Sequence, residues 1–236
     1  SVETLGATTV ICSDKTGTLT ENRMTVTGID AAGHRIDMLE TMRHASPAFA
    51  GVQASPLGES GPVAVVPNEV RTLLAAVALC NDAELCKNNR HWEVVGDPTE
   101  GALLVVARKA GLDERTLQKL FPRIDEIPFD SARQYMATRH EIQGVHFAYF
   151  KGALERLLPR SVSMLDCEGL TIPLRNDEIE LAASSMAAEG LRVLAVARLV
   201  IGAACSLDAA SADTGLQFIG LLGMVDPPRP KAITAV

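Results

Sequence analysis

The stretch that decides the fold is residues 13–20, Ser13-Asp14-Lys15-Thr16-Gly17-Thr18-Leu19-Thr20, which follows the apolar, β-prone run 8–12. Such a run predicts a short buried strand. An acidic residue at the carboxyl end of a strand, followed by Gly and Thr, lies where α/β sheets place their chemistry. The Asp14 carboxylate can attack a phosphoryl group, and the hydroxyls and backbone donors beside it can face phosphate oxygens. We therefore favour phosphoryl transfer over the alternative, a strand followed by a Gly turn with a capping Asp.

From Asp14 to Thr20 the sequence resembles the phosphorylation signature of the P-type ATPases, ion pumps that pass through an aspartyl-phosphate. The resemblance implies that Asp14 is the nucleophile, with the charge of Lys15 beside it and Thr18 touching the phosphoryl oxygens. It also implies that Asp14 and the main-chain carbonyl of Thr16 supply two Mg²⁺ ligands.

The parent fold that this resemblance implies is haloacid-dehalogenase-like, and relatives of that fold usually carry a second Asp two residues after the nucleophile. In this chain that position is Thr16. Because a hydroxyl is a poor general base, the acyl phosphate should persist. A persistent intermediate suits a pump and does not suit a phosphatase.

Composition excludes several classes of partner. The net charge of −7 argues against a nucleic-acid partner and against electrostatic docking on anionic lipid. Five cysteines without a C-x-x-C pair predict reduced thiols rather than a disulfide framework. No run reaches the roughly 18 apolar residues that a membrane span needs. With the pump resemblance, we expect a soluble cytoplasmic piece of an integral membrane protein.

The remaining pattern predicts an α+β domain, an antiparallel sheet flanked by helices. The resemblance implies that this domain is inserted in a partial haloacid-dehalogenase-like α/β phosphorylation domain. We assign residues 1–23 to the start of the phosphorylation domain, 24–226 to the nucleotide-binding domain, and 227–236 to a hinge and a truncated return. Residues 45–67, rich in Pro, Gly, Ala and Ser, predict a poorly ordered loop. Helices are expected from Asn68, acting as the cap, to Cys80, from Asp97 to Gly111, from Asp113 to Leu120, after Gly152, and over 176–188. Extended segments are expected at 24–29, 92–95, 134–141, 145–150, 191–200 and 218–225, with 134–150 forming a hairpin.

Short motifs of the inserted domain stand in the order that the family shows. Residues 96–100, Gly-Asp-Pro-Thr-Glu, resemble its acidic helix-start segment, which implies that Glu100 binds the adenine amino group. A carboxylate suits this task because it accepts hydrogen bonds from an exocyclic amine. The alternative is a capping box, in which Asp97 caps the helix and Glu100 reaches back to the cap.

Residues 128–136 resemble the family segment whose Phe stacks on adenine. The resemblance implies that Phe129 holds the base and that Met136 lines its pocket. The alternative for Phe129 is a place in the core. Gln134 stands where many relatives have Lys, so a charge-assisted contact to the ligand is lost, and Arg133 offers a compensating charge.

Two later motifs complete the expected site. Residues 150–153, Phe-Lys-Gly-Ala, resemble the motif whose lysine lies at the pocket mouth, which implies contact of Lys151 with the nucleotide and close backbone approach at Gly152. Residues 190–195 resemble the motif in which Arg192 reaches the phosphates and Leu194 lies near the base. The alternatives are a solvated lysine and a strand-edge arginine on a wet face.

Residues 226–230, Asp-Pro-Pro-Arg-Pro, form a stiff segment because prolines fix φ. It matches the family's hinge motif, which implies that Asp226 and Arg229 help two domains close on ATP. An ordinary turn is the alternative.

We interpret the chain as the ATP-binding cytoplasmic fragment of a cation-transporting P-type ATPase, closest in motif spelling to the calcium-pump-like branch. ATP or ADP and Mg²⁺ are its expected ligands, and the remaining phosphorylation, actuator and transmembrane domains of the same pump are its expected partners. We expect nucleotide binding without turnover in the isolated fragment. The alternatives are a haloacid-dehalogenase-type phosphatase and a non-catalytic nucleotide-binding module. The transported ion is not predicted.

Overall fold

The computed structural model describes residues 18, 20, 21, 23–38, 66–88, 91–208 and 214–229. The expected strand at 8–12, the residues Asp14, Lys15 and Thr16, and the loop predicted up to residue 65 lie outside these ranges. In the described ranges, no helix has both the length and the apolar character needed to cross a bilayer.

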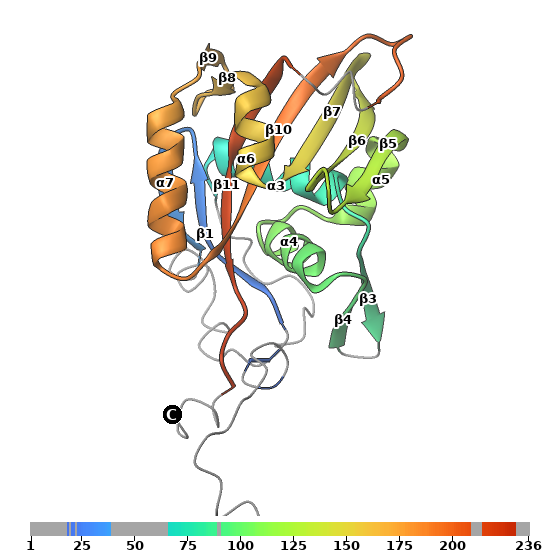
Figure 1. The fold of residues 1–236 in the computed structure, drawn as a ribbon. Coiled ribbons are helices and arrows are strands. Elements are labelled where there is room, and N and C mark those ends of the chain that lie inside the picture. The colour runs from blue at the N-terminus through green and yellow to red at the C-terminus, as the bar shows by residue number, and fades with distance from the viewer. Residues whose placement is uncertain are drawn as a thin grey trace, which may run out of the picture.

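A nine-stranded sheet forms the centre of the described part of the chain (Figure 1). Its main path runs β2-β1-β11-β10-β7-β6-β5, and every neighbouring pair along it is antiparallel. β8 adds a parallel pairing to β11, and β9 pairs with β8. The strands are β1 (Thr25–Ala31), β2 (His34–Asp37), β5 (Arg123–Asp130), β6 (Tyr135–Ile142), β7 (Val145–Gly152), β8 (Ser161–Leu165), β9 (Thr171–Pro173), β10 (Arg192–Ile201) and β11 (Leu216–Val225). A separate hairpin joins β3 (Glu84–Asn88) and β4 (His91–Val95).

Helices cover both faces of the sheet, which confirms the predicted antiparallel sheet with flanking helices. On one face lie α3 (Asn68–Leu79), α4 (Pro98–Lys109) and α5 (Glu114–Leu120). On the other lie α6 (Leu154–Leu157), a single 3₁₀ turn η3 (Leu158–Arg160), and α7 (Asn176–Ala188). Figure 1 shows α6 and α7 on one side of the strands and α3 on the other.

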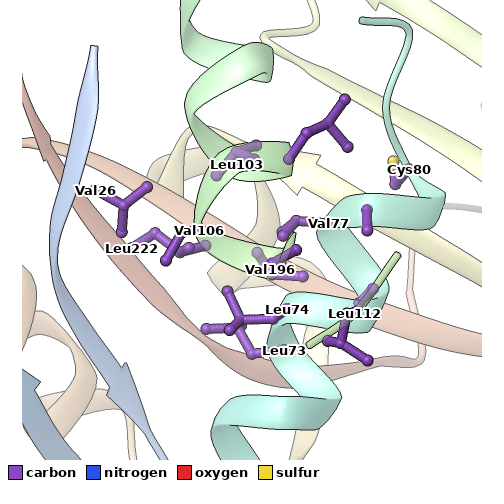
Figure 2. Packing of buried hydrophobic residues seen from close by; sticks show 14 of the residues in the cluster. Val26, Leu73, Leu74, Val77, Cys80, Leu103, Val106, Leu112, Val196 and Leu222 are labelled. Atoms are coloured by element: carbon purple, nitrogen blue, oxygen red, sulfur yellow. The ribbon is translucent and has the colours of Figure 1, made fainter. Parts of the chain in front are cut away.

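The core under α3 and α4 contains mainly aliphatic side chains. Leu73, Leu74 and Val77 of α3 meet Leu103 and Val106 of α4 over the sheet (Figure 2). Each fully buried aliphatic side chain contributes about 1.5–3 kcal/mol. β10 sends Val196 into this core and its neighbours Ala195 and Ala197 into the core under α7. The poor alternation of β10 in the sequence therefore reflects burial on both faces, as predicted.

One local prediction is corrected and another is confirmed. Asn68 is the first residue of α3 and not its cap: Pro67 occupies the cap position, with φ −56° and ψ 157°, and no side chain caps the helix. The extended segment predicted at 24–29 is confirmed and belongs to β1, an inner strand between β11 and β2. Proline fixes an extended backbone immediately before a helix, which explains why Pro67 and not Asn68 occupies the cap position.

The hairpin of β6 and β7 is confirmed. Its two-residue turn places Gln143 and Gly144 at φ 52° and 80°, and Ile142 faces Val145. Positive φ at both central residues gives the turn type that matches strand twist.

Candidate functional site

The first turn of α4 places one carboxylate against the sheet. Asp97 caps the helix, because its Oδ1 accepts hydrogen bonds from the backbone nitrogens of Thr99 (2.8 Å) and Glu100 (3.3 Å). The Glu100 side chain turns elsewhere: Oε1 lies 2.5 Å from Lys151 Nζ, and Oε2 accepts from the backbone nitrogen of Asp82 at 3.0 Å. Asp97 therefore caps α4, whereas the Glu100 carboxylate takes no part in the cap and is held by Lys151 and the Asp82 nitrogen.

The Glu100–Lys151 pair is largely withdrawn from solvent. The Lys151 side chain is 6% exposed and that of Glu100 is 16% exposed. A charge so buried needs a partner, so Lys151 is not a freely solvated lysine. Each carboxylate oxygen has a second lone pair, so Glu100 can still accept a hydrogen bond from a ligand amine through its exposed edge.

Strand register places further predicted residues on the same face as this pair. Met136 lies opposite Lys151 on β6, and Val196 lies opposite it on β10. Because side chains alternate along a strand, Leu194 and Arg192 share the face of Val196, with Arg192 about 13 Å further along β10. Arg192 is exposed and Leu194 is half-buried against the core.

Phe129 is not a core residue. Its side chain lies near the end of the edge strand β5 and is 61% exposed. The end of β5, the start of β6, the end of β7 and the start of β10 lie together at one end of the antiparallel sheet. The Phe129 ring therefore lies at the same end as Lys151. Met136 is 2% exposed, so its side chain packs under this end of the sheet and offers almost no surface to a ligand.

In the turn between β5 and β6, the side chains of Arg133 and Gln134 bond to neighbouring residues of the domain and do not extend toward a ligand. Arg133 folds back, and its Nη2 donates to the Pro128 carbonyl at 2.8 Å. Hydrogen bonds from the Arg133 and Ala132 backbone nitrogens hold the pKa of Asp130 below 3.8. Gln134, at φ 60°, accepts from Arg156 Nε at 2.9 Å. An arginine on α6 thus adjoins the position where the resemblance expects a lysine.

Gly152 serves the approach of two strands. A Cβ at this position would lie 2.4 Å from the Gln134 carbonyl oxygen and 2.5 Å from Tyr135 Cβ. Such distances are not tolerated without a shift of backbone, so β7 requires glycine here to lie against the start of β6.

Two linkers, the chain segment just before β1 and the segment just after β11, are hydrogen-bonded to each other. Asp226 Oδ2 accepts from Thr20 Oγ1 at 2.6 Å, and Oδ1 accepts from the Arg23 backbone nitrogen at 3.0 Å. Arg229 Nε donates to the Thr20 carbonyl at 2.9 Å. Since β11 ends at Val225 beside the start of β10, these linkers leave the sheet at the end where Arg192 lies. Thr18, the described residue of the catalytic set, is exposed.

The structure therefore brings Glu100, Met136 and Lys151 into one cluster and places Phe129, Leu194 and Arg192 at the same end. Two hollows lined by described residues lie elsewhere, one beside Asn68 and Asp166 and the other along residues 174–178. Neither of these hollows is part of the candidate site.

Three residues behind Glu100 were missed by sequence reasoning. Asn81 is 2% exposed and donates to the Val77 and Glu100 carbonyls at 3.3 and 3.1 Å. Arg123 contacts both Asn81 and Asp82. The available signal was an Asn directly after an apolar helix, a residue type that satisfies free carbonyls at helix ends.

Comparison with known proteins gives consistent matches. A family model described as "P-type ATPase, cytoplasmic domain N" matches residues 69–231. Over the whole chain, the cation-transporting ATPase pma1 of Synechocystis is 43% identical, the probable cation-transporting ATPase F of Mycobacterium bovis 41%, and the calcium-transporting ATPase of Bacillus subtilis 35%. The chain spans about a quarter of the length of these relatives, 26% in each case.

Proposed function

Because the chain belongs to the P-type ATPase family and matches its cytoplasmic domain N, we propose that it binds ATP at the sheet end that carries Glu100, Phe129 and Lys151. One observation carries this proposal: residues from α4, β5, β6, β7 and β10 converge on one end of the sheet, and the bonded linkers leave from that end. A nucleotide held there would face the segment that leads back to Asp14.

The described residues fit the base of the nucleotide. The exposed ring of Phe129 is free to stack on a purine, which contributes about 1–3 kcal/mol per base in nucleic-acid complexes. Glu100 retains lone pairs for the adenine amino group, and Lys151 holds that carboxylate in place. Leu194, half-buried on β10 at the same end of the sheet, would supply apolar surface for the base.

The phosphates would extend toward Arg192, whose fork donates paired hydrogen bonds to phosphate oxygens. Arg192 is exposed and has no ion pair among the described residues. Gln134 cannot supply the charge that a lysine would, and Arg156 beside it is a second cation at this turn. We expect micromolar to millimolar affinity for ATP or ADP.

In the whole protein, we propose that Asp14 accepts the γ-phosphoryl group, with Lys15, Thr16 and Thr18 around it, within a haloacid-dehalogenase-like domain that begins at residues 1–23 and resumes at 227–236. Asp14 and the Thr16 carbonyl would hold Mg²⁺, which neutralises phosphate charge when bound. Asp226 and Arg229 would couple the nucleotide domain, 24–226, to that domain. The phosphorylation would drive cation transport through membrane and actuator domains of the same pump.

Calorimetry with ATP tests the proposed binding. Phe129→Ala should weaken ATP binding by about fivefold or more, because about 1–3 kcal/mol of stacking is lost. The control is Leu181→Ala on α7, where the side chain is 72% exposed and remote in the fold. Equal affinity of the wild type and the Phe129 variant would remove the stacking claim. Rapid hydrolysis of an aryl phosphate by the chain would favour the phosphatase alternative instead.

A further inference from the structure

The carboxylate of Glu100 is backed by a network from two other elements. Asn81, next to the C-cap residue of α3, donates to the Glu100 carbonyl at 3.1 Å and to the Val77 carbonyl at 3.3 Å, and its Oδ1 accepts from the Ala83 nitrogen at 2.9 Å. This buried amide ties the end of α3 to the first turn of α4. Three satisfied hydrogen bonds fix the backbone of residues 81–83.

Arg123, at the start of β5, clamps the same segment from outside. Its Nη2 donates to the Asn81 carbonyl at 2.6 Å, and its Nη1 lies 2.7 Å from both Asp82 Oδ1 and Glu126 Oε2. Charge-assisted bonds of this kind are roughly twice as strong as neutral ones. The guanidinium therefore holds the Asp82 backbone in one orientation.

That orientation matters because the Asp82 nitrogen donates to Glu100 Oε2 at 3.0 Å, while Lys151 holds Oε1 at 2.5 Å. Anchors on both oxygens fix the plane of the carboxylate. Its remaining lone pairs then point in fixed directions, as recognition of a single donor requires.

We propose that Asn81, Asp82 and Arg123 are positioning residues that set the preference for a 6-amino purine by holding Glu100. This inference rests on the proposed ATP site. ATP presents an amino donor to the carboxylate, whereas ITP presents a carbonyl oxygen at that position. A fixed carboxylate opposes that oxygen, whereas a carboxylate that can rotate avoids it.

The test compares affinities for ATP and ITP by calorimetry on the full chain. The wild type should prefer ATP by about tenfold or more, the effect of one hydrogen bond to a charged group. Arg123→Gln and Asp82→Asn should each reduce the ratio by about threefold or more, mainly by weakening ATP. Arg175→Gln, which breaks an exposed 3.3 Å pair with Glu178 on α7, is the control and should leave the ratio unchanged.

The outcomes separate the two proposals. An unchanged ATP-to-ITP ratio in both variants, or an equal loss of both affinities, would overturn the positioning role. A wild type that binds both nucleotides equally would overturn it as well and would remove the Glu100 contact, while leaving the stacking site intact. Absence of any nucleotide binding would overturn the proposed function itself. Thermal melts verify folding, and Asp82→Asn, at a side chain that is 52% exposed, decides the matter if Arg123→Gln does not fold.

Discussion

Replacement of Lys151 by Met should destabilise the domain through the charge that it leaves behind. Met is one heavy atom shorter than Lys but keeps an unbranched apolar side chain, so little packing is lost. The Glu100 carboxylate, 16% exposed, would keep only its hydrogen bond from the Asp82 nitrogen. A buried charge without its partner is costly, and this is the source of the effect.

The magnitude follows from the burial of the pair. Removal of one partner of a fully buried pair costs about 3–5 kcal/mol, and the partial exposure of Glu100 lowers the expected cost of Lys151→Met to about 2–3 kcal/mol. Glu100→Gln should cost about 3 kcal/mol, because the ammonium of Lys151 is the more buried partner. The double variant lacks both charges and should cost about 3 kcal/mol, less than the two single changes combined.

Urea unfolding followed by far-UV circular dichroism measures these free energies. The matched control is Lys119→Met on the exposed side of α5, which should change stability by less than about 0.5 kcal/mol. The double-mutant cycle should give a coupling of about 2–3 kcal/mol between positions 100 and 151. Additive changes, or a Lys151 variant as stable as the control, would refute the buried pair.

Three further predictions test the fold around the site. Gly152→Ala should cost about 2–4 kcal/mol in urea unfolding, because the new Cβ meets the Gln134 carbonyl at 2.4 Å; a neutral result would contradict the close approach of β6 and β7. Asp97→Ala should cost about 1 kcal/mol through loss of the α4 cap, and Asp97→Asn should restore most of it; equal loss in both variants would contradict capping. Burial lowers the pKa of His140 below 6.5, so its contribution to stability is complete above that pH and declines as the pH falls below it. His140→Gln should therefore flatten the dependence of the unfolding free energy between about pH 7.5 and 5.5, and an unchanged slope would exclude this histidine as its source.

Local chemistry predicted the elements that depend on neighbouring residues. The Asp97 cap with Pro98, the turn at Gly144 and the stop at Gly190 all follow from residue types next to one another, and the structure has each of them. These features form from interactions within a few residues, so a single sequence contains the whole signal.

Edge strands and long-range pairings could not be predicted in the same way. β5 buries only Ile127, so it shows no apolar alternation, and β1 pairs with β11, a partner almost two hundred positions away. Short strands such as β9 depend on the strand beside them. Tertiary context forms these strands, and their own sequences carry little evidence of it.

The candidate site shows the same division. Motif resemblance selected Glu100 and Lys151, but only the structure pairs them at 2.5 Å, and only the structure reveals Asn81 and Arg123 behind them. It also turns Arg133 back onto its own turn and places Arg156 beside Gln134. The roles of Asp14, Lys15 and Thr16 stay predictions.

The most direct test of the central claim is a titration of the isotopically labelled chain with ATP, followed by NMR of backbone amides. The account predicts that the largest shifts fall on residues 100, 129, 134–136, 151–152 and 192–194, at one end of the sheet, while α7 stays unchanged. Shifts concentrated elsewhere, such as beside Asn68 and Asp166, would contradict it.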